Sequence, residues 1–242
     1  MPPQAQLFIT CIADTLYPQI GEATVSILKR SGVQVGFPQG QTCCGQPAFN
    51  AGMHQQARQI AEHTIRVFEQ TLGEIVIPSG SCAAMIRHHY PGLFVGDNVW
   101  YARAKAIADR TFELTEYLVD VLGIVDVGAR YPGKVTYHSS CHLLRELGVD
   151  RQPRLLLANV REAEFIEMPY TDECCGFGGV FSVEQPEISA AMLDRKIINI
   201  TTSQAPVVVA CDAGCITHIN GGLHRRGMQQ RAVHIAEILA SR

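Results

Sequence analysis

The stretch ECCGFGG, residues 173–179, places two adjacent cysteines in a loop with three glycines and one aromatic residue. A disulfide requires Cα atoms about 5.5–6 Å apart, whereas the Cα atoms of neighbouring residues are only about 3.8 Å apart. Cys174 and Cys175 are therefore poor partners for each other. We expect each thiol to find a partner elsewhere in the fold, and a metal centre is one such partner.

The CCG triplet occurs a second time, at residues 43–45, and the other cysteines repeat around both copies. One cysteine lies 32 positions before the first pair and another 38 positions after it, and the second pair has spacings of 33 and 40. This ordered match indicates an internal duplication, with halves at residues 1–128 and 129–242. The repeated residues are Cys11, Cys43, Cys44 and Cys82 in one half, and Cys141, Cys174, Cys175 and Cys215 in the other.

Short apolar runs alternate with segments of helical periodicity in both halves. This alternation predicts an α/β fold of two duplicated halves, each a small parallel sheet with crossover helices, related by a pseudo-two-fold axis. The predicted strands are 7–11, 33–37, 74–78, 134–138, 164–168 and 206–210, and the predicted helices are 13–31, 55–72, 112–122 and 188–201.

Every repeated cysteine follows one of these strands. Loops at the carboxyl ends of parallel strands open on one edge of the sheet, which is where such sheets bind ligands. We therefore expect the four cysteines of each half to converge. The glycines of the two loops allow positive φ and a close approach of the backbone to a bulky cofactor; they are Gly45, Gly176, Gly178 and Gly179.

Four thiolates per half suit either a tetrahedral zinc ion or an iron–sulfur centre. Structural zinc usually uses two close C-x₂₋₄-C pairs, whereas here one lone cysteine, one adjacent pair and one distant cysteine repeat. The pattern favours an iron–sulfur cluster, with a zinc-binding scaffold as the alternative. A third interpretation is a thiol–disulfide enzyme, and the absence of a C-x-x-C motif argues against it.

Composition narrows the class of protein. The net charge of -3 over 242 residues argues against a nucleic-acid surface. We expect neither a signal peptide nor a membrane span, so the nine cysteines indicate a reducing compartment in which disulfides are rare. No G-x-G-x-x-G or G-x-x-x-x-G-K-[ST] fingerprint occurs, and the chain alone has no obvious acceptor for a hydride.

Three stretches carry a resemblance to a known family: VTYHSSCHLLRELG at residues 135–148, ECCGFGGVFSV at 173–183 and CDAGCITHINGGL at 211–223. With the doubled C…CCG…C pattern, they resemble the lactate utilisation protein A family. They are also similar to the cysteine-rich CCG domain that occurs in heterodisulfide reductase and in the iron–sulfur subunit of glycolate oxidase. The resemblance implies a cytoplasmic, non-flavin iron–sulfur subunit of a system that oxidises L-lactate to pyruvate, with two other lactate utilisation proteins as partners.

The chain departs from the fuller CCG motif, which ends in C-x-x-C. Ser79 replaces the first cysteine of that motif in the first half, and Asp212 replaces it in the second, where Cys211 lies one position early. With four matched cysteines per half, we expect up to two [4Fe–4S] clusters. Ser79, Asp212 or a water would fill an open iron position. Further candidates for a ligand or for a hydrogen bond to the centre are Cys211, His138 and His142.

Overall fold

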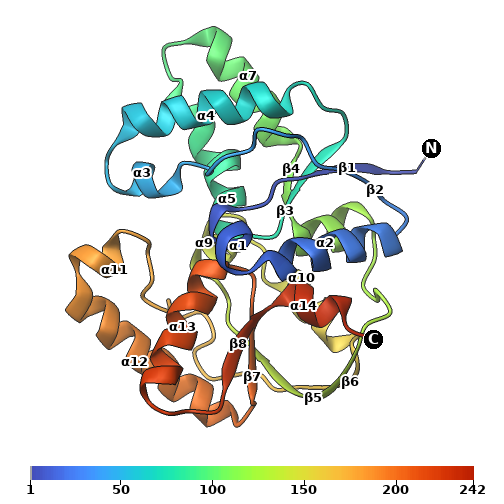
Figure 1. Cartoon of the computed structure of the whole chain (residues 1–242), viewed down its shortest axis with the longest axis vertical. Helices are drawn as coiled ribbons and strands as arrows, with labels where there is room; N and C mark the ends of the chain where they lie inside the picture. Colours follow the sequence, from blue (N-terminus) through green and yellow to red (C-terminus); the bar gives the residue numbers. More distant parts are fainter. Residues whose placement is uncertain (1) are drawn as a thin grey trace.

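The computed structural model describes residues 2–242 and contains two four-stranded sheets whose strands are all parallel (Figure 1). The strand order is β2-β1-β3-β4 in the first sheet and β6-β5-β7-β8 in the second. This confirms the predicted α/β class with two similar halves. The strands are β1 Gln4–Leu7, β2 Gln34–Gly36, β3 Glu74–Ile77, β4 Thr111–Glu113, β5 Arg130–Tyr137, β6 Arg161–Phe165, β7 Val207–Ala210 and β8 Arg231–His234.

The two sheets correspond strand by strand. The strand that opens each half, β1 or β5, lies between the second and third strands of its sheet. Just beyond it, the Phe8 amide donates to the Val76 carbonyl at 3.0 Å, and the His138 amide donates to the Val209 carbonyl at 2.9 Å. Phe8 and His138 therefore occupy the same position in the two halves.

The sequence patterns missed the fourth strand of each sheet. β4 has three residues and lies where the sequence predicts the start of a helix at 112, while β8 was not predicted at all. Both strands lie at a sheet edge and are too short to show an alternation of apolar and polar residues. β1 also ends at Leu7, earlier than the predicted strand 7–11, because the chain turns into a helix at Cys11.

The predicted helix 13–31 is divided in two at Tyr17 and Pro18. Proline lacks the amide that an uninterrupted helix needs and is favoured at a helix start, so α2 begins at Pro18. The helices of the first half are α1 Cys11–Leu16, α2 Pro18–Arg30, α3 Gln46–Asn50, α4 His54–Phe68, α5 Gly80–Ala84, α6 Tyr90–Leu93, α7 Asn98–Asp109 and α8 Leu114–Glu116, with π-helical turns at Met85–His89 and Tyr117–Val121. Those of the second half are α9 Cys141–Arg145, α10 Arg151–Ala158, α11 Phe181–Glu184, α12 Pro186–Ser203, α13 Ala213–Arg225 and α14 Ile235–Ala240.

Helices from one half pack on helices from the other. α2 packs against α14, α5 against α9, and α1 against α13, so the carboxyl edges of the two sheets face each other across the middle of the molecule (Figure 1). One hydrophobic core takes residues from both halves, including Leu28 and Tyr117 from the first and Leu157 and Leu239 from the second. The division into domains at residue 128 therefore stays a prediction, because the halves share this core. Among the helices of residues 2–242, none has the length and apolar character of a membrane crossing.

Candidate metal centre

The cysteines lie where the strands end. Cys11 and Cys141 are the first residues of α1 and α9, and Cys82 and Cys215 lie in the first turn of the helices that follow β3 and β7. The adjacent pairs lie in the loops after β2 and β6. Each sheet edge thus gathers its four thiols, as the spacing predicts.

The backbone of the CCG loops depends on glycine. Gly45 and Gly176 have φ values of 87° and 89°, in the left-handed region that disfavours residues with a Cβ. A Cβ at Gly176 would also lie 2.6 Å from the carbonyl oxygen of Ser189 in α12. The Gly45 amide donates a hydrogen bond to Cys43 Sγ, and the Gly176 amide donates one to Cys174 Sγ, both at 3.4 Å.

The adjacent cysteines of the first half turn to different partners. Cys43 Sγ lies 3.7 Å from Cys11 Sγ, and Cys44 Sγ lies 3.2 Å from Cys82 Sγ. Cys44 and Cys82 are buried, Cys43 is half-buried and Cys11 is exposed. The half therefore has a buried pair of thiols beneath a pair that opens toward solvent.

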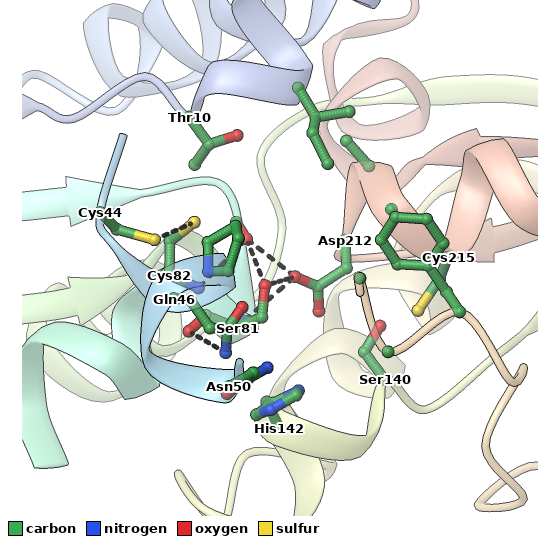
Figure 2. A pocket seen from close by; sticks show the side chains of 18 of the residues that line it. Thr10, Cys44, Gln46, Asn50, Ser81, Cys82, Ser140, His142, Asp212 and Cys215 are labelled. Carbon is green, nitrogen blue, oxygen red and sulfur yellow. Dashed lines mark hydrogen bonds between the residues drawn. The ribbon is translucent and has the colours of Figure 1, made fainter. Parts of the chain in front are cut away.

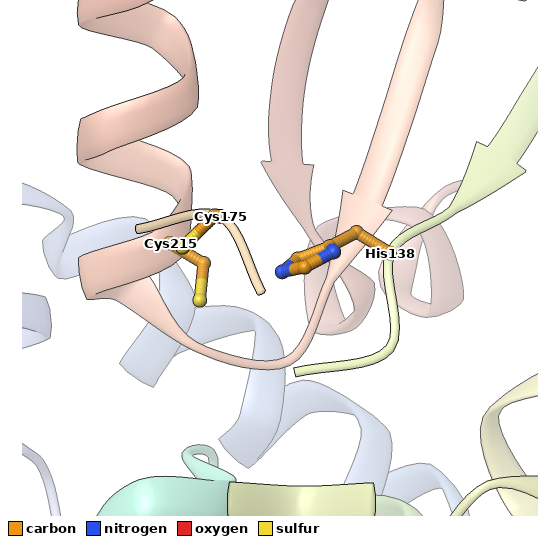
Figure 3. Close-up of side chains that lie close together, drawn as sticks. All are labelled: His138, Cys175 and Cys215. Carbon is orange, nitrogen blue, oxygen red and sulfur yellow. The ribbon is translucent and has the colours of Figure 1, made fainter. Parts of the chain in front are cut away.

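The second half repeats this arrangement. Cys174 Sγ lies 4.0 Å from Cys141 Sγ, and both residues are half-buried. Cys175 and Cys215 form the buried pair, and the ring of His138 joins them, all three ligand atoms lying within 4.8 Å of one another (Figure 3). Among the described residues, the first half contains no such group of three.

The thiols influence one another in the same way in both halves. The pKa of Cys43 is lowered to about 2, chiefly by the thiol of Cys11 and then by that of Cys44 and by the Gly45 amide. The pKa of Cys174 is lowered to about 2 by the corresponding thiols, Cys141 and Cys175, and by the Gly176 amide. One thiolate per half is thus stabilised by its neighbours, which is the protonation state a metal requires.

All eight repeated cysteines line one cavity of about 210 Å³ between the two sheet edges. Figure 2 shows Cys44 and Cys82 of the first half and Cys215 of the second among the residues of its wall. The spacing of the cysteines along the chain predicts that they converge within each half. It does not predict this common cavity, because cysteine spacing contains no information about how the two halves dock. The wall also includes side chains that the sequence reasoning did not single out, and their only signal is proximity to a cysteine in the chain: Thr10, Ile12, Gln46, Pro47, Asn50, Ser81, Ser140, Phe177 and Val180.

Asp212 joins the two halves at this cavity. Its Oδ1 accepts hydrogen bonds from Ser79 Oγ at 2.8 Å, from Ser81 Oγ at 2.7 Å and from the Ser81 amide at 3.0 Å. The two residues that replace motif cysteines are therefore bonded to each other. A ligand role for either Ser79 or Asp212 stays a prediction.

The remaining candidates lie at different depths. His142 lines the cavity, with its Nδ1 3.5 Å from Cys141 Sγ. His138 is fully buried, and desolvation lowers the pKa of its imidazole to about 3, so the ring is neutral. Cys211 is not among the residues that line the cavity; it packs in the core with its Sγ 3.8 Å from the hydroxyl of Tyr137.

Known proteins are similar to this chain over nearly its whole length. The cysteine-rich CCG domain family matches residues 5–87 and 135–220 of the chain. The lactate utilization protein A of an Exiguobacterium strain is 48% identical over 98% of this chain and 97% of its own length. That of a Geobacillus strain is 47% identical over 99% and 100%, and lactate utilization protein A 2 of a Bacillus cereus strain is 44% identical over 98% of both. Among solved structures, a putative Asp/Glu racemase from Yersinia pestis has a TM-score of 0.37 at 10% identity, covering 98% of this chain and 96% of that chain.

Proposed function

The chain belongs to the lactate utilization protein A family of cysteine-rich CCG proteins, and from this premise we propose that it is the iron–sulfur electron-transfer component of a system that oxidises L-lactate to pyruvate. The observation that carries the proposal is the pair of matched thiol tetrads that face one cavity. A chain that uses thiols only to fill its core has no reason to place eight of them at two facing sheet edges.

The thiols fit a metal centre in each half. Two thiolates on one tetrahedral ion lie about 3.8 Å apart, given metal–sulfur bonds of about 2.3 Å. Three sulfur pairs in the chain are separated by 3.2–4.0 Å, which is the spacing on a single ion; the thiolates of a multi-iron cluster bind different irons, so the side chains would spread to hold one. Cys11, Cys43, Cys44 and Cys82 would hold a centre in the first half, and Cys141, Cys174, Cys175 and Cys215 would hold one in the second.

An iron–sulfur cluster supplies one-electron transfer at such a site, and the chain supplies its surroundings. The amides of Gly45 and Gly176 donate to cysteine sulfurs, which stabilises negative charge on the ligands and so affects the reduction potential. The cavity wall joins the two sets of thiols, so an electron that enters one half has a short route to the other.

The surroundings of the thiols suit a relay better than the binding of lactate. Asp212 is the carboxylate on the cavity wall, and its charge repels the carboxylate of the substrate. We therefore place lactate oxidation on a partner and expect the two other lactate utilisation proteins, in the cytoplasm, to exchange electrons with this chain. Cys11 is exposed, which gives the first half a contact point for such a partner.

Zinc is the alternative, and one observation favours it in the second half. Cys175, Cys215 and His138 form a set of nitrogen and sulfur donors of the kind that zinc prefers. A zinc ion there would make that half a scaffold, and electrons would pass through the first half alone.

Metal and sulfide content tests the proposal directly. We expect protein purified without oxygen to contain about four irons and four acid-labile sulfides per half, given four thiolates in each. We also expect an EPR signal after reduction. Zinc without sulfide would support the scaffold instead, and the absence of both iron and sulfide would contradict the relay.

Ligand variants test whether each half holds its own centre. Cys44→Ser and Cys175→Ser are matched, because both residues are the buried second cysteine of a CCG triplet. Each variant should lose the metal of its own half and keep that of the other, so total iron should fall by about half. Cys211→Ser is the control and should keep both centres, since its thiol lies in the core. Loss of all metal from either CCG variant would instead indicate one centre shared by the two halves.

A further inference from the structure

The buried imidazole of His138 has no hydrogen bond of normal geometry. Neither Nδ1 nor Nε2 makes one within residues 2–242, and the side chain is fully buried. Desolvation lowers the pKa of the ring, although the Thr171 backbone lies close enough to raise it in part. Buried polar atoms almost always have a partner, because an unmet donor or acceptor loses its hydration without compensation. An imidazole in this state requires a partner that the polypeptide does not provide.

The ring lies beside two thiols. Its nearest nitrogen and the Sγ atoms of Cys175 and Cys215 lie within 4.8 Å of one another, and Figure 3 shows the ring extending toward the two cysteines. A metal ion bonded to two sulfurs at about 2.3 Å and to a nitrogen at about 2.0–2.1 Å needs these atoms roughly 3.6–3.8 Å apart. Small side-chain rotations therefore suffice to bring all three onto one ion.

The first half shows that this position does not need an imidazole for packing. Phe8 has the same place after β1 and the same amide hydrogen bond, to Val76 in place of Val209. Phe8 is fully buried and packs on Phe68 with ring centroids 5.6 Å apart. An apolar ring thus satisfies the fold here, whereas an unbonded imidazole destabilises it.

We infer that His138 is a metal ligand, which makes the second-half centre a mixed imidazole–thiolate site and leaves the first half with thiolates alone. This inference rests on the proposed function and extends it, because it makes the two centres unequal. His138 would be a fifth donor beside the four cysteines of this half, and on an iron–sulfur centre it would take the position of one thiolate. Imidazole in place of thiolate raises the reduction potential of such a centre. Lys196 would also raise the reduction potential of the second-half centre. It is fully buried, and its Nζ donates to the carbonyls of Tyr170 and Thr171 just before the second CCG loop.

The equivalent helix of the first half, α4, buries only uncharged side chains: Ala57, Ala61, Thr64, Ile65 and Phe68. A buried cation near a cluster favours the reduced, more negative state. With clusters bound, the second-half centre would therefore have the higher potential, and electrons would pass from the first half toward the second.

The experiment compares His138→Phe, which copies the first half, with His142→Phe, which removes the cavity-wall histidine whose Nδ1 lies 3.5 Å from Cys141 Sγ. Both are made in the Cys44→Ser background, so that metal is confined to the second half. For iron, the readout is the nitrogen hyperfine coupling in protein labelled with ¹⁵N-histidine; for zinc, it is the nitrogen contribution to the X-ray absorption of the metal. We expect the nitrogen signal to be lost in His138→Phe and kept in His142→Phe, and the potential of an iron centre to fall in the first variant only.

The outcomes separate this inference from the proposed function. Metal in the second half with sulfur ligands only, or a nitrogen signal that survives His138→Phe, overturns the ligand role of His138 and leaves the relay intact. The absence of metal from both halves of the unmodified protein overturns the relay and the ligand role together.

The metal-free His138→Phe protein should unfold at the same or a higher temperature than its parent, because Phe8 shows that the fold accepts this ring. A lower temperature would mean that the imidazole stabilises the fold without a metal.

Discussion

The two halves have the same thiol geometry but different surroundings. In both, the first cysteine of the CCG triplet pairs with the cysteine after the opening strand, and the glycine amide donates to it at 3.4 Å. Around the thiols the halves differ: Phe8 corresponds to His138, and exposed Cys11 corresponds to half-buried Cys141. The duplicated backbone therefore determines where the sulfurs lie, and substitutions around them make the two sites chemically distinct.

The interface between the halves is also made of corresponding but unlike residues. Ser79 and Asp212 have the same position in the repeat and bond to each other across it. Glu113 and His234 are each the final residue of the last strand of a sheet and cap the next helix with a capping box. The symmetry places Ser79 opposite Asp212, and the hydroxyl donor of one meets the carboxylate acceptor of the other.

Removing the Asp212 carboxylate should break the connection between the halves most strongly. Asp212→Ala leaves the buried hydroxyl and amide of the Ser79–Ser81 turn without their shared acceptor, and we expect a loss of about 3 kcal/mol in the free energy of unfolding. Urea unfolding of the metal-free protein measures this.

Asp212→Asn is the matched control, because its amide oxygen can still accept at the Oδ1 position. It should lose much less stability than Asp212→Ala. Equal stability of Asp212→Ala and the unmodified protein would mean that these hydrogen bonds do not hold the halves together.

A methyl group at the helix crossing should produce the next largest effect. A Cβ at Gly80 in α5 would lie 2.5 Å from the Cβ of Leu143 in α9, so Gly80→Ala should destabilise the protein by about 1–3 kcal/mol. Gly221→Ala in α13 meets open space and should be neutral or stabilise by up to about 1 kcal/mol. Thermal unfolding of the two variants should therefore move in opposite directions. A Gly80→Ala protein as stable as Gly221→Ala would show that the halves separate easily.

The effect that is smallest in a single comparison, up to about 1.4 kcal/mol for one pH unit, is a difference in pH dependence between the two capping residues. Burial raises the pKa of Glu113 from 4.5 to about 8, so the folded protein keeps a proton there that the unfolded chain releases. Its contribution to stability is present below pH 4.5 and is lost as the pH rises toward 8. Burial lowers the pKa of His234 from 6.5 to about 4, so its contribution is present above pH 6.5 and is lost as the pH falls.

Glu113→Gln isolates the first of these contributions. The free energy of unfolding of the variant, relative to that of the unmodified protein, should increase by up to about 1.4 kcal/mol per pH unit between pH 5 and 8. Urea titrations of both proteins across this range measure the difference, and the unchanged His234 contribution cancels. A difference that does not vary with pH would show that Glu113 is ionised in the folded protein.

Much of the fold could be predicted from the sequence, because its signals are local. Six of the eight strands lie near their predicted positions, since each overlaps or adjoins a short apolar run in front of a loop. β4 and β8 were missed because three- and four-residue edge strands carry almost no periodicity. Pro18 is a local signal for the start of a helix, but the helical spacing of apolar residues on both sides of it favours one continuous helix over 13–31.

The sequence alone determined that this protein has two α/β halves with four matched thiols at the carboxyl edge of each sheet. Chain spacing suffices for that, because the positions of strands and of the loops after them follow from local patterns, and the loops at the carboxyl ends of parallel strands share one edge. Only the tertiary structure decided that the two edges face one cavity, that Asp212 bonds to Ser79 and Ser81 across it, and that His138 is buried without a hydrogen bond while Cys211 lies in the core. These features depend on how α5 packs on α9 and α1 on α13, and contacts between residues distant in the chain leave no periodic trace in it.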